Sequence, residues 1–399
     1  MKPCYAHSLW QWIAGSTCAV TLIPRPAQAQ AQTPAEWTLH RTADGAHPSG
    51  TEQEMVWLMN RARANPAAEG HFLAATGDVS TQFAISFFGV DVARMKAEFA
   101  AIAPSPPAAF DRRLYRASVR HSNYMISIGT QTHDGQFELV EDEGFNYTGI
   151  MLSVFAHGNT AVHTHATLNI DPGGPSGEGG MQPGRGHRQA TMSSHPALPE
   201  FTNVGLALVP GINTGTGVGP LVFSGAYASV RENASDGFNR FIVGTVWTDL
   251  NADGRYQSGE GLSGVIVQPD HGPWYAVTGG AGGYAIPITS AGSYMLTFSG
   301  STFPGIHTRA VTVGNISVLV DAETNSLPPR PAVPLAASLT PSPAGGLTLA
   351  WSGGNPPWQV QKMDKTTGGW INVGSPTQEL SMALRLEGSS GIFRVAGSP

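Results

Sequence analysis

The sequence predicts a multidomain protein in which a helix-containing domain precedes two small all-β sandwiches. The chain has 399 residues, more than the roughly 250 to 300 at which a single hydrophobic core stops growing. Charged residues make up 13% of it, and it contains 49 glycines and 30 prolines, a composition typical of loop-rich, β-rich extracellular proteins. Apolar residues follow helical spacing in the first third of the chain and alternate with polar residues near its end.

Residues 1–31 carry the pattern of a secretory signal peptide. A mostly apolar run extends from Leu9 to Ile23, and residues 27–29 form a small-x-small cleavage motif. We expect cleavage after Ala29 or Ala31. A transmembrane anchor is disfavoured because the run is shorter than the roughly 20 apolar residues that cross a bilayer.

The mature chain is expected to be exported and to contain no disulfide. Both cysteines, Cys4 and Cys18, lie within the signal peptide. No other apolar stretch is long enough to span a membrane. The formal net charge is -6 and no basic run is present, so nucleic acid is not an expected partner. We therefore expect a secreted, extracellular protein, with the periplasm or the cell surface as alternatives.

Three helices are predicted after a polar linker over residues 32–50. Thr51 and Glu54 fit a capping box, and apolar residues at helical spacing follow them. A second helix is predicted from Val90 to Ala103, and a third after Asp111. The apolar face of the third helix consists of Leu114, Ala117, His121, Tyr124 and Met125. On such a face we expect His121 to be a hydrogen-bonded core residue.

Several ordered motifs between Thr51 and Val230 resemble one known family. They are MVWLMNRARANPAAEG, FDRRLYRASVRHSNYM with THDG shortly after it, GRGHR, and NVGLALVPG. Together they resemble the bacterial, SCP-like branch of the CAP superfamily of cysteine-rich secretory, antigen 5 and pathogenesis-related 1 proteins. The resemblance assigns residues 51–232 to a CAP domain. It implies an α-β-α sandwich, of the α+β class, with a cleft where two histidines and two acidic residues can bind a divalent metal.

The two cleft histidines of the family fall on His133 and His187 of this chain. The resemblance thus implies that folding brings these two rings to the edge of one pocket. They would hold Zn²⁺ or act as acid and base.

The acidic half of the family's cleft is less complete. The family has Gly-Glu-Asn after the first histidine, where this chain has Gly149, Ile150 and Met151. Isoleucine can neither bind a metal nor transfer a proton. The second acidic position is assigned to Asp171, with Glu178 as the alternative.

Three further histidines, His157, His163 and His165, lie between these positions. On a strand, His163 and His165 would point to the same side, as in some metal sites. The alternative is that they are exposed polar residues at the rim of a sheet.

The most sharply spaced motif lies in a predicted domain at residues 240–323. It reads DLNADGRYQSGE and fits the DxNxDGxxxxxE pattern, in which oxygen ligands at alternate positions wrap a calcium ion. The predicted calcium ligands are Asp249, Asn251, Asp253, the backbone carbonyl of Arg255, Gln257 directly or through water, and Glu260.

The flanks of this loop predict strands and not the helices of an EF-hand. Val243, Thr245 and Trp247 precede it, and residues 265–267 follow it. The domain resembles the calcium-binding B repeats of bacterial surface adhesins, which are transthyretin-like β-sandwiches. The resemblance implies a structural Ca²⁺. An acidic turn without metal is the alternative.

Residues 324–336 form a Pro-rich linker, which we expect to be stiff. Residues 337–399 alternate apolar and polar residues between turns and resemble fibronectin type III-like modules. The predicted core of this module consists of Trp351, Trp358, Val360, Trp370 and Phe393.

These features favour a ligand-binding or interaction protein whose partner is a protein, a peptide, a glycan or an apolar ligand at the cell surface. Ile150 at an expected acidic position favours binding over catalysis. The alternative is a CAP-type metal-dependent hydrolase that uses His133 and His187, with Asp171 as its carboxylate. A third possibility, apolar-ligand or sterol carriage, is implied by some relatives of the family.

Overall fold

The computed structural model describes residues 33–174, 178–211, 217–233, 235–300, 302–326, 336–342, 346–352, 355–377, 379–384 and 391–398. The predicted signal peptide, with both cysteines and the cleavage site, lies outside the described residues. So does most of the predicted Pro-rich linker, of which the structure describes residues 324–326 and 336. Among the described residues, no helix combines the length and the apolar character needed to cross a membrane.

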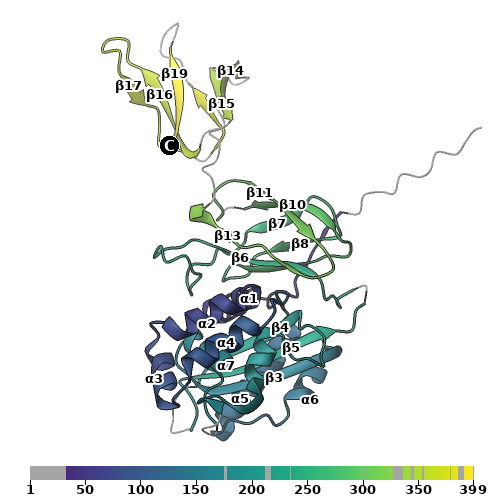
Figure 1. The fold of residues 1–399 in the computed structure, drawn as a ribbon. Coiled ribbons are helices and arrows are strands. Elements are labelled where there is room, and N and C mark those ends of the chain that lie inside the picture. Colours follow the sequence, from purple (N-terminus) through teal and green to yellow (C-terminus); the bar gives the residue numbers. More distant parts are fainter. Residues whose placement is uncertain are drawn as a thin grey trace, which may run out of the picture. The chain divides into compact units, whose positions relative to one another are not determined.

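The chain is a multidomain α+β protein (Figure 1), with a mixed α/β N-terminal region and several small sheets in its C-terminal half. The elements of the N-terminal region are α1 (Gly50–Ala64), α2 (Pro66–Ala75), α3 (Val79–Phe87), α4 (Val92–Ala101), β2 (Ala109–Phe110), α5 (Arg112–Ile128), α6 (Gln136–Asp142), β3 (Tyr147–Gly158), α7 (Ala161–Ile170), η2 (Pro183–Arg185), α8 (Gly186–Met192), β4 (Asn203–Pro210) and β5 (Leu221–Val230).

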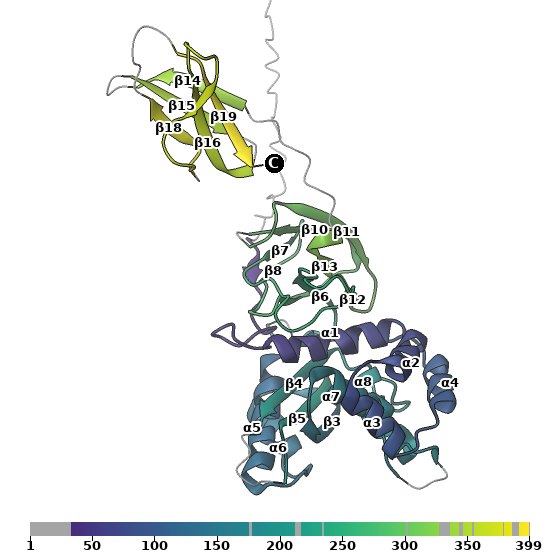
Figure 2. The same ribbon diagram turned by 90° about the vertical axis from the view of Figure 1, so that its left-hand side faces the viewer.

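The four strands of this region form one sheet, which helices cover on both faces (Figure 2). The strand order is β2-β4-β5-β3, and only the β2–β4 pair is parallel. Side chains of β5 alternate between the two faces. Phe223 and Tyr227 pack with residues of α1 and α7, whereas Ala226 and Ala228 pack with residues of α5.

Helix α5 approaches the sheet most closely at Gly205 of β4. A Cβ atom there would lie 2.1 Å from the backbone of Leu114 and of Tyr115. Glycine within a strand often marks such a close approach of another backbone.

Residues 240–323 contain two further sheets. The strands are β6 (Phe241–Trp247), β7 (Ile266–Pro269), β8 (Trp274–Val277), β9 (Gly283–Pro287), β10 (Gly292–Ser299), β11 (His307–Val313), β12 (Val318–Leu319) and β13 (Ala322–Glu323). One sheet has the order β1-β8-β7-β10-β11, and in the other β12, β13 and β9 pair with β6. The strands that flank the acidic loop are present as predicted.

The segment predicted to be a linker before the first helix is packed and not free. Residues Ala35–Glu36 form β1, which pairs in parallel with β8. Trp37 is buried against Phe241 and Trp274. The sequence prediction gave too little weight to Trp37 and to Leu39, which packs in the same cluster.

The first helix begins two residues earlier than predicted, with Ser49 and not Thr51 as its N-cap. Ser49 and Glu52 form the capping box: the backbone N–H of Ser49 donates to Glu52 Oε2 at 2.8 Å, and that of Glu52 to Ser49 Oγ at 3.4 Å. Glu54 instead accepts a hydrogen bond from the backbone of Ser258, at 3.4 Å. The third helix is present as predicted, with Asp111 as its cap and His121 buried on it, but Tyr124, predicted on its apolar face, is 42% exposed.

The C-terminal module has two three-stranded sheets. Its strands are β14 (Ala336–Pro341), β15 (Leu347–Ser352), β16 (Asn355–Met363), β17 (Trp370–Asn372), β18 (Ser381–Leu384) and β19 (Phe393–Ser398). Trp351, Trp358 and Val360 are buried in its core, and Phe393 packs against them, as predicted.

Trp370 does not belong to this core, contrary to the prediction. It pairs with Met363, which alternation places on the opposite face of β16 from Val360. The Trp370 ring is partly exposed, and the guanidinium of Arg394 lies 4.2 Å from its centre.

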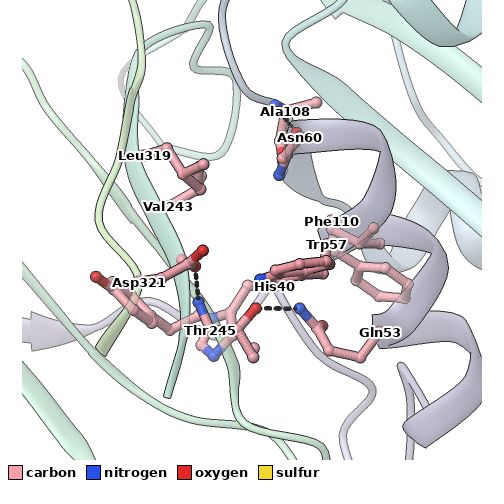
Figure 3. A pocket seen from close by; sticks show the side chains of 14 residues that line it. His40, Gln53, Trp57, Asn60, Ala108, Phe110, Val243, Thr245, Leu319 and Asp321 are labelled. Carbon is pink, nitrogen blue, oxygen red and sulfur yellow. Dashed lines mark hydrogen bonds between the residues drawn. The ribbon is translucent and has the colours of Figure 1, made fainter. Parts of the chain in front are cut away.

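Helix α1 also contacts strand β6. The side chain of Gln53 donates a hydrogen bond to Thr245 Oγ1 at 2.9 Å, and the rings of Trp57 and Trp247 meet edge to face. Beside them (Figure 3), Asp321 Oδ1 accepts a hydrogen bond from the backbone of Thr245 at 2.8 Å. Burial raises the pKa of Asp321 to about 6, although this hydrogen bond opposes the shift.

We predict that Gly205→Ala destabilises the protein by about 1–3 kcal/mol, because the added methyl group would push α5 off the sheet. Gly292→Ala is the matched control, since a Cβ atom at that position meets no atom within 4 Å. Urea unfolding of both variants measures the difference. Equal midpoints would contradict the close approach of α5 to β4.

We predict that Asp321→Asn reduces the pH dependence of stability. Because the folded pKa is about 6 and the usual value is 3.8, the contribution of Asp321 to wild-type stability should be fully present below pH 3.8 and should be lost as the pH rises through 6. The loss should be on the order of 1–2 kcal/mol, since the residue is partly exposed. Thermal melts from pH 4 to 8 measure it. Asp270→Asn is the control, because the carboxyl of Asp270 is exposed and its pKa is lowered and not raised. Parallel curves of stability against pH for the wild type and Asp321→Asn would refute the prediction.

Candidate functional site

A cleft of about 730 Å³ lies in the N-terminal region. Its walls come from α3, β3, α7 and the start of α8. Its lining includes the apolar side chains of Phe83, Phe155 and Leu168 and the polar side chains of Asp171 and His187. A cleft of this size can enclose a small molecule.

Asp171 and His187 form a hydrogen-bonded pair in this cleft. Asp171 Oδ1 lies 2.8 Å from His187 Nδ1, and Oδ2 accepts from the backbone N–H of His187 at 3.2 Å. An ionised carboxylate can only accept, so Nδ1 carries a proton and Nε2 of the neutral ring is a hydrogen-bond acceptor.

The backbone of Asp171 adopts an unusual conformation to make this pair. It ends α7 with a φ of 58°, in the left-handed region, which is unfavourable for a residue other than glycine. The side chain is only 1% exposed, so the carboxylate is reached mainly through His187. Such strain is often found at functional sites.

His163 presents the opposite polarity to the cleft. Its Nδ1 accepts a hydrogen bond from the backbone N–H of Asn159 at 3.2 Å. In the neutral ring the proton is therefore on Nε2, which is a donor. Burial lowers the pKa of His163 and so favours this neutral form.

The prediction that His163 and His165 lie on a strand is wrong. Thr160 accepts a hydrogen bond from the backbone of His163 and caps α7, so both histidines are helical. Two residues apart on a helix, they point to different sides. His163 lines the cleft, whereas His165 is buried and pairs with Glu69 at 2.8 Å.

His133 is exposed and does not line this cleft, although Gln131 does. Its Nδ1 lies 2.6 Å from Gln136 Oε1, and Gln136 in turn donates to Ser224 Oγ. Of the two predicted cleft histidines, the structure therefore places His187 in the cleft, together with Asp171.

The remaining sequence candidates lie elsewhere. Ile150 packs among residues of α5 and α6, on the other face of the sheet. Glu178 forms ion pairs with Arg94 and Arg185, at 3.1 and 3.2 Å. Asp171 is thus the acidic residue that accompanies His187.

The rim of the cleft is formed by an apolar helix that the sequence reasoning missed. Val79, Phe83 and Phe87 of α3 are 81%, 67% and 69% exposed, and the two Phe rings stack at 5.6 Å. Their spacing of four residues in a helix without charged side chains was the available signal.

The predicted calcium loop is closed by its own hydrogen bonds. Asp249 accepts from the backbone of Asp253 and Gly254, at 3.2 and 2.8 Å, and Glu260 accepts from Leu250 and Gln257, at 3.0 and 2.8 Å. In the part of the chain that the structure describes, no three His, Cys, Asp or Glu side chains converge on a point that could hold a metal ion.

The loop also contacts the N-terminal region. The guanidinium of Arg255 lies 4.1 Å from the centre of the Phe72 ring of α2. Tyr256 is buried in a cluster with Trp57 and Phe72. The loop is therefore part of the packing between residues 240–323 and helices α1 and α2.

No protein-family model matches the chain, and no curated protein matches it. Among solved structures, it has a similarity to a chain from Bacteroides uniformis ATCC 8492 described as a "putative carbohydrate binding protein". The two share 13% identity over 40% of this chain and 80% of the other, with a TM-score of 0.15. A similarity of this size carries no argument about function.

Proposed function

We propose that this chain is an exported modular protein whose N-terminal region, a bacterial CAP-type domain, binds a small amphipathic ligand. The observation that carries the proposal is the cleft of about 730 Å³ that apolar side chains and the Asp171–His187 pair line together. The apolar body of the ligand would lie against Phe83, Phe155 and Leu168. Its polar group would exchange hydrogen bonds with His187.

Two further observations support a CAP-type domain with a binding role. Helices cover both faces of the sheet, as the family resemblance implies, and His187 and Asp171 share one cleft. Ile150 is packed away from that cleft, so the acidic group that the family has at this position is missing here. A reduced set of acidic groups favours binding over catalysis.

The cleft polarity favours a ligand that both donates and accepts hydrogen bonds. His187 Nε2 is an acceptor in its neutral form and His163 Nε2 a donor. A protein, a peptide or a glycan at the cell surface remains an alternative partner.

The second candidate function is hydrolysis, and the Asp171–His187 pair is the observation that favours it. Asp171 fixes the proton on Nδ1, which leaves Nε2 free to remove a proton from water. The predicted Zn²⁺ fits the observed residues poorly, because His133 does not line the cleft and Nδ1 of His163 is already hydrogen-bonded.

We further propose that residues 240–323 form an adhesin B-repeat-like, transthyretin-like module with a structural Ca²⁺. The donor set is suitable, because six positions within twelve residues offer carboxylate, amide or backbone oxygens, the ligands that Ca²⁺ prefers. Asp249 and Glu260 would exchange their backbone hydrogen bonds for the cation. For residues 337–399, the two packed three-stranded sheets support a fibronectin type III-like module.

We predict that Phe83→Ser weakens binding of an uncharged apolar probe, N-phenyl-1-naphthylamine, by about tenfold. The substitution removes roughly 1.5 kcal/mol or more of apolar contact from the cleft wall. Fluorescence titration measures the affinity. The control is Phe137→Ser, which makes the same substitution at another exposed phenylalanine, on α6, that does not line the cleft. Equal affinities for the two variants would argue against a ligand in this cleft.

We predict that EGTA lowers the melting temperature and that added Ca²⁺ restores it. A cation that binds only the folded state stabilises it, by about 2.7 kcal/mol at 100 times Kd. Differential scanning calorimetry measures the shift, with Kd expected in the millimolar to submillimolar range. Glu260→Gln should abolish it, whereas Glu323→Gln, outside the loop, should not. If Ca²⁺ leaves the wild-type melt unchanged, the loop is an acidic turn without metal.

A further inference from the structure

A small closed cavity lies where α1 meets the strands of residues 240–323 (Figure 3). Its volume is about 20 Å³. Polar side chains from several segments line it, among them His40 from the segment before α1, Trp57 from α1, and Asp321 from between β12 and β13. The rest of the lining mixes polar side chains, namely Gln53, Asn60, Thr245 and Tyr284, with apolar ones that include Val56, Phe110, Val243 and Leu319.

His40 offers the cavity an acceptor. Its Nε2 lies 2.8 Å from the carbonyl oxygen of Val277, which can only accept, so Nε2 carries the proton. Burial lowers the pKa of His40 to about 4, and the ring is therefore neutral at pH 7. Its Nδ1 is buried and has no hydrogen-bond partner among the described residues. This nitrogen is an unsatisfied acceptor.

Trp57 offers the cavity a donor. Its Nε1 is buried and, within the described part of the chain, has no well-aligned acceptor. The indole lies near the carboxylate of Asp321, where it favours the charged form and so opposes the rise in the pKa of that group. An indole N–H can only donate. Asp321 adds a carboxylate, one oxygen of which, Oδ1, is already bonded to the backbone of Thr245.

We propose that this cavity binds one water molecule that joins the three segments. The water donates one hydrogen to His40 Nδ1, accepts from Trp57 Nε1, and donates its second hydrogen to the carboxylate of Asp321. Three partners are what a typical buried water has, and a volume of about 20 Å³ holds one water and not two.

The polarity of the lining excludes a small ion as the occupant. A cation would face the hydrogen of the Trp57 indole, whereas an anion would face the lone pair of His40 and the charge of Asp321. Water alone both donates and accepts. It would satisfy two buried groups that otherwise lose their hydrogen bonds to solvent on folding.

The bound water would link segments far apart in the sequence, at residues 40, 57 and 321. It would add to the direct contact between Gln53 and Thr245. Residues 34–323 should accordingly unfold as one cooperative unit.

The test compares two tryptophans of one hydrophobic cluster. Trp57 and Trp247 are 8% and 4% exposed, and Nε1 of each lacks a partner among the described residues, but only Trp57 lines the cavity. Trp57→Phe removes a donor that holds the water, so the melting temperature of the full chain should fall by about 2–4 °C more than in Trp247→Phe. Equal shifts, or a larger fall in Trp247→Phe, would overturn the proposal.

A crystal structure of the wild-type protein provides a second measurement, independent of whether the variants fold. We expect one density peak about 2.7–3.2 Å from both His40 Nδ1 and Trp57 Nε1. A dry cavity, or a direct hydrogen bond from Trp57 Nε1 to the carboxylate of Asp321 or to His40 Nδ1, would exclude the water.

Discussion

The burial of α1 on all sides is the constraint on which the rest of the described structure depends. Met55 and Met59 pack in the cluster beneath the four-stranded sheet, and Trp57 and Leu58 pack in a second cluster with α2, α4 and Trp247. Gln53 reaches Thr245 of β6. Since one helix serves both clusters, its sequence cannot show a single apolar stripe.

Even the charged end of α1 is buried. The guanidinium of Arg63 is 0% exposed and donates to the carbonyl oxygens of Thr191 and Phe201, at 2.7 and 2.6 Å. Burial lowers its pKa to about 10, so it stays protonated at neutral pH. Hydrogen bonds to these carbonyl oxygens thus replace the hydrogen bonds to water that the guanidinium loses on burial. Through Arg63, α1 holds the end of α8 and the chain that leads into β4.

Local patterns predicted those features that local physics determines. Asp111 caps α5 because its side chain reaches the backbone of Arg113, and His121 is buried because it lies on the apolar stripe of that helix. Features set by distant residues were missed. Ser49 and Glu52 outcompete Thr51 and Glu54 as the cap because Glu52 also accepts from Leu208 of the sheet, a contact that no sequence window contains.

In the candidate site too, features set by neighbouring residues could be predicted from the sequence, whereas features set by distant residues could not. The resemblance identified Asp171 and His187, but neither spacing nor periodicity could show that Asp171 ends α7 in a left-handed conformation. For His163, Thr160 was a local signal: as an N-cap residue it would have predicted a helix at this position and not a strand. The position of His133 outside the cleft depends on Gln136 and Ser224, residues distant from each other in the chain.

His187 and Arg188, which are neighbours on α8, have different roles at the cleft. Arg188 donates to the carbonyl oxygens of Asn169 and Ile170, at 2.5 and 3.1 Å, and its other nitrogen pairs with Glu98. These carbonyls end α7 just before Asp171, so Arg188 fixes the point at which the chain turns into its strained conformation. The carboxylate of Asp171 is therefore already in position to bond to His187 Nδ1. Arg188 fixes the turn, and His187 binds the carboxylate that the turn presents. The fold itself therefore sets the positions of these hydrogen-bonding groups in the cleft.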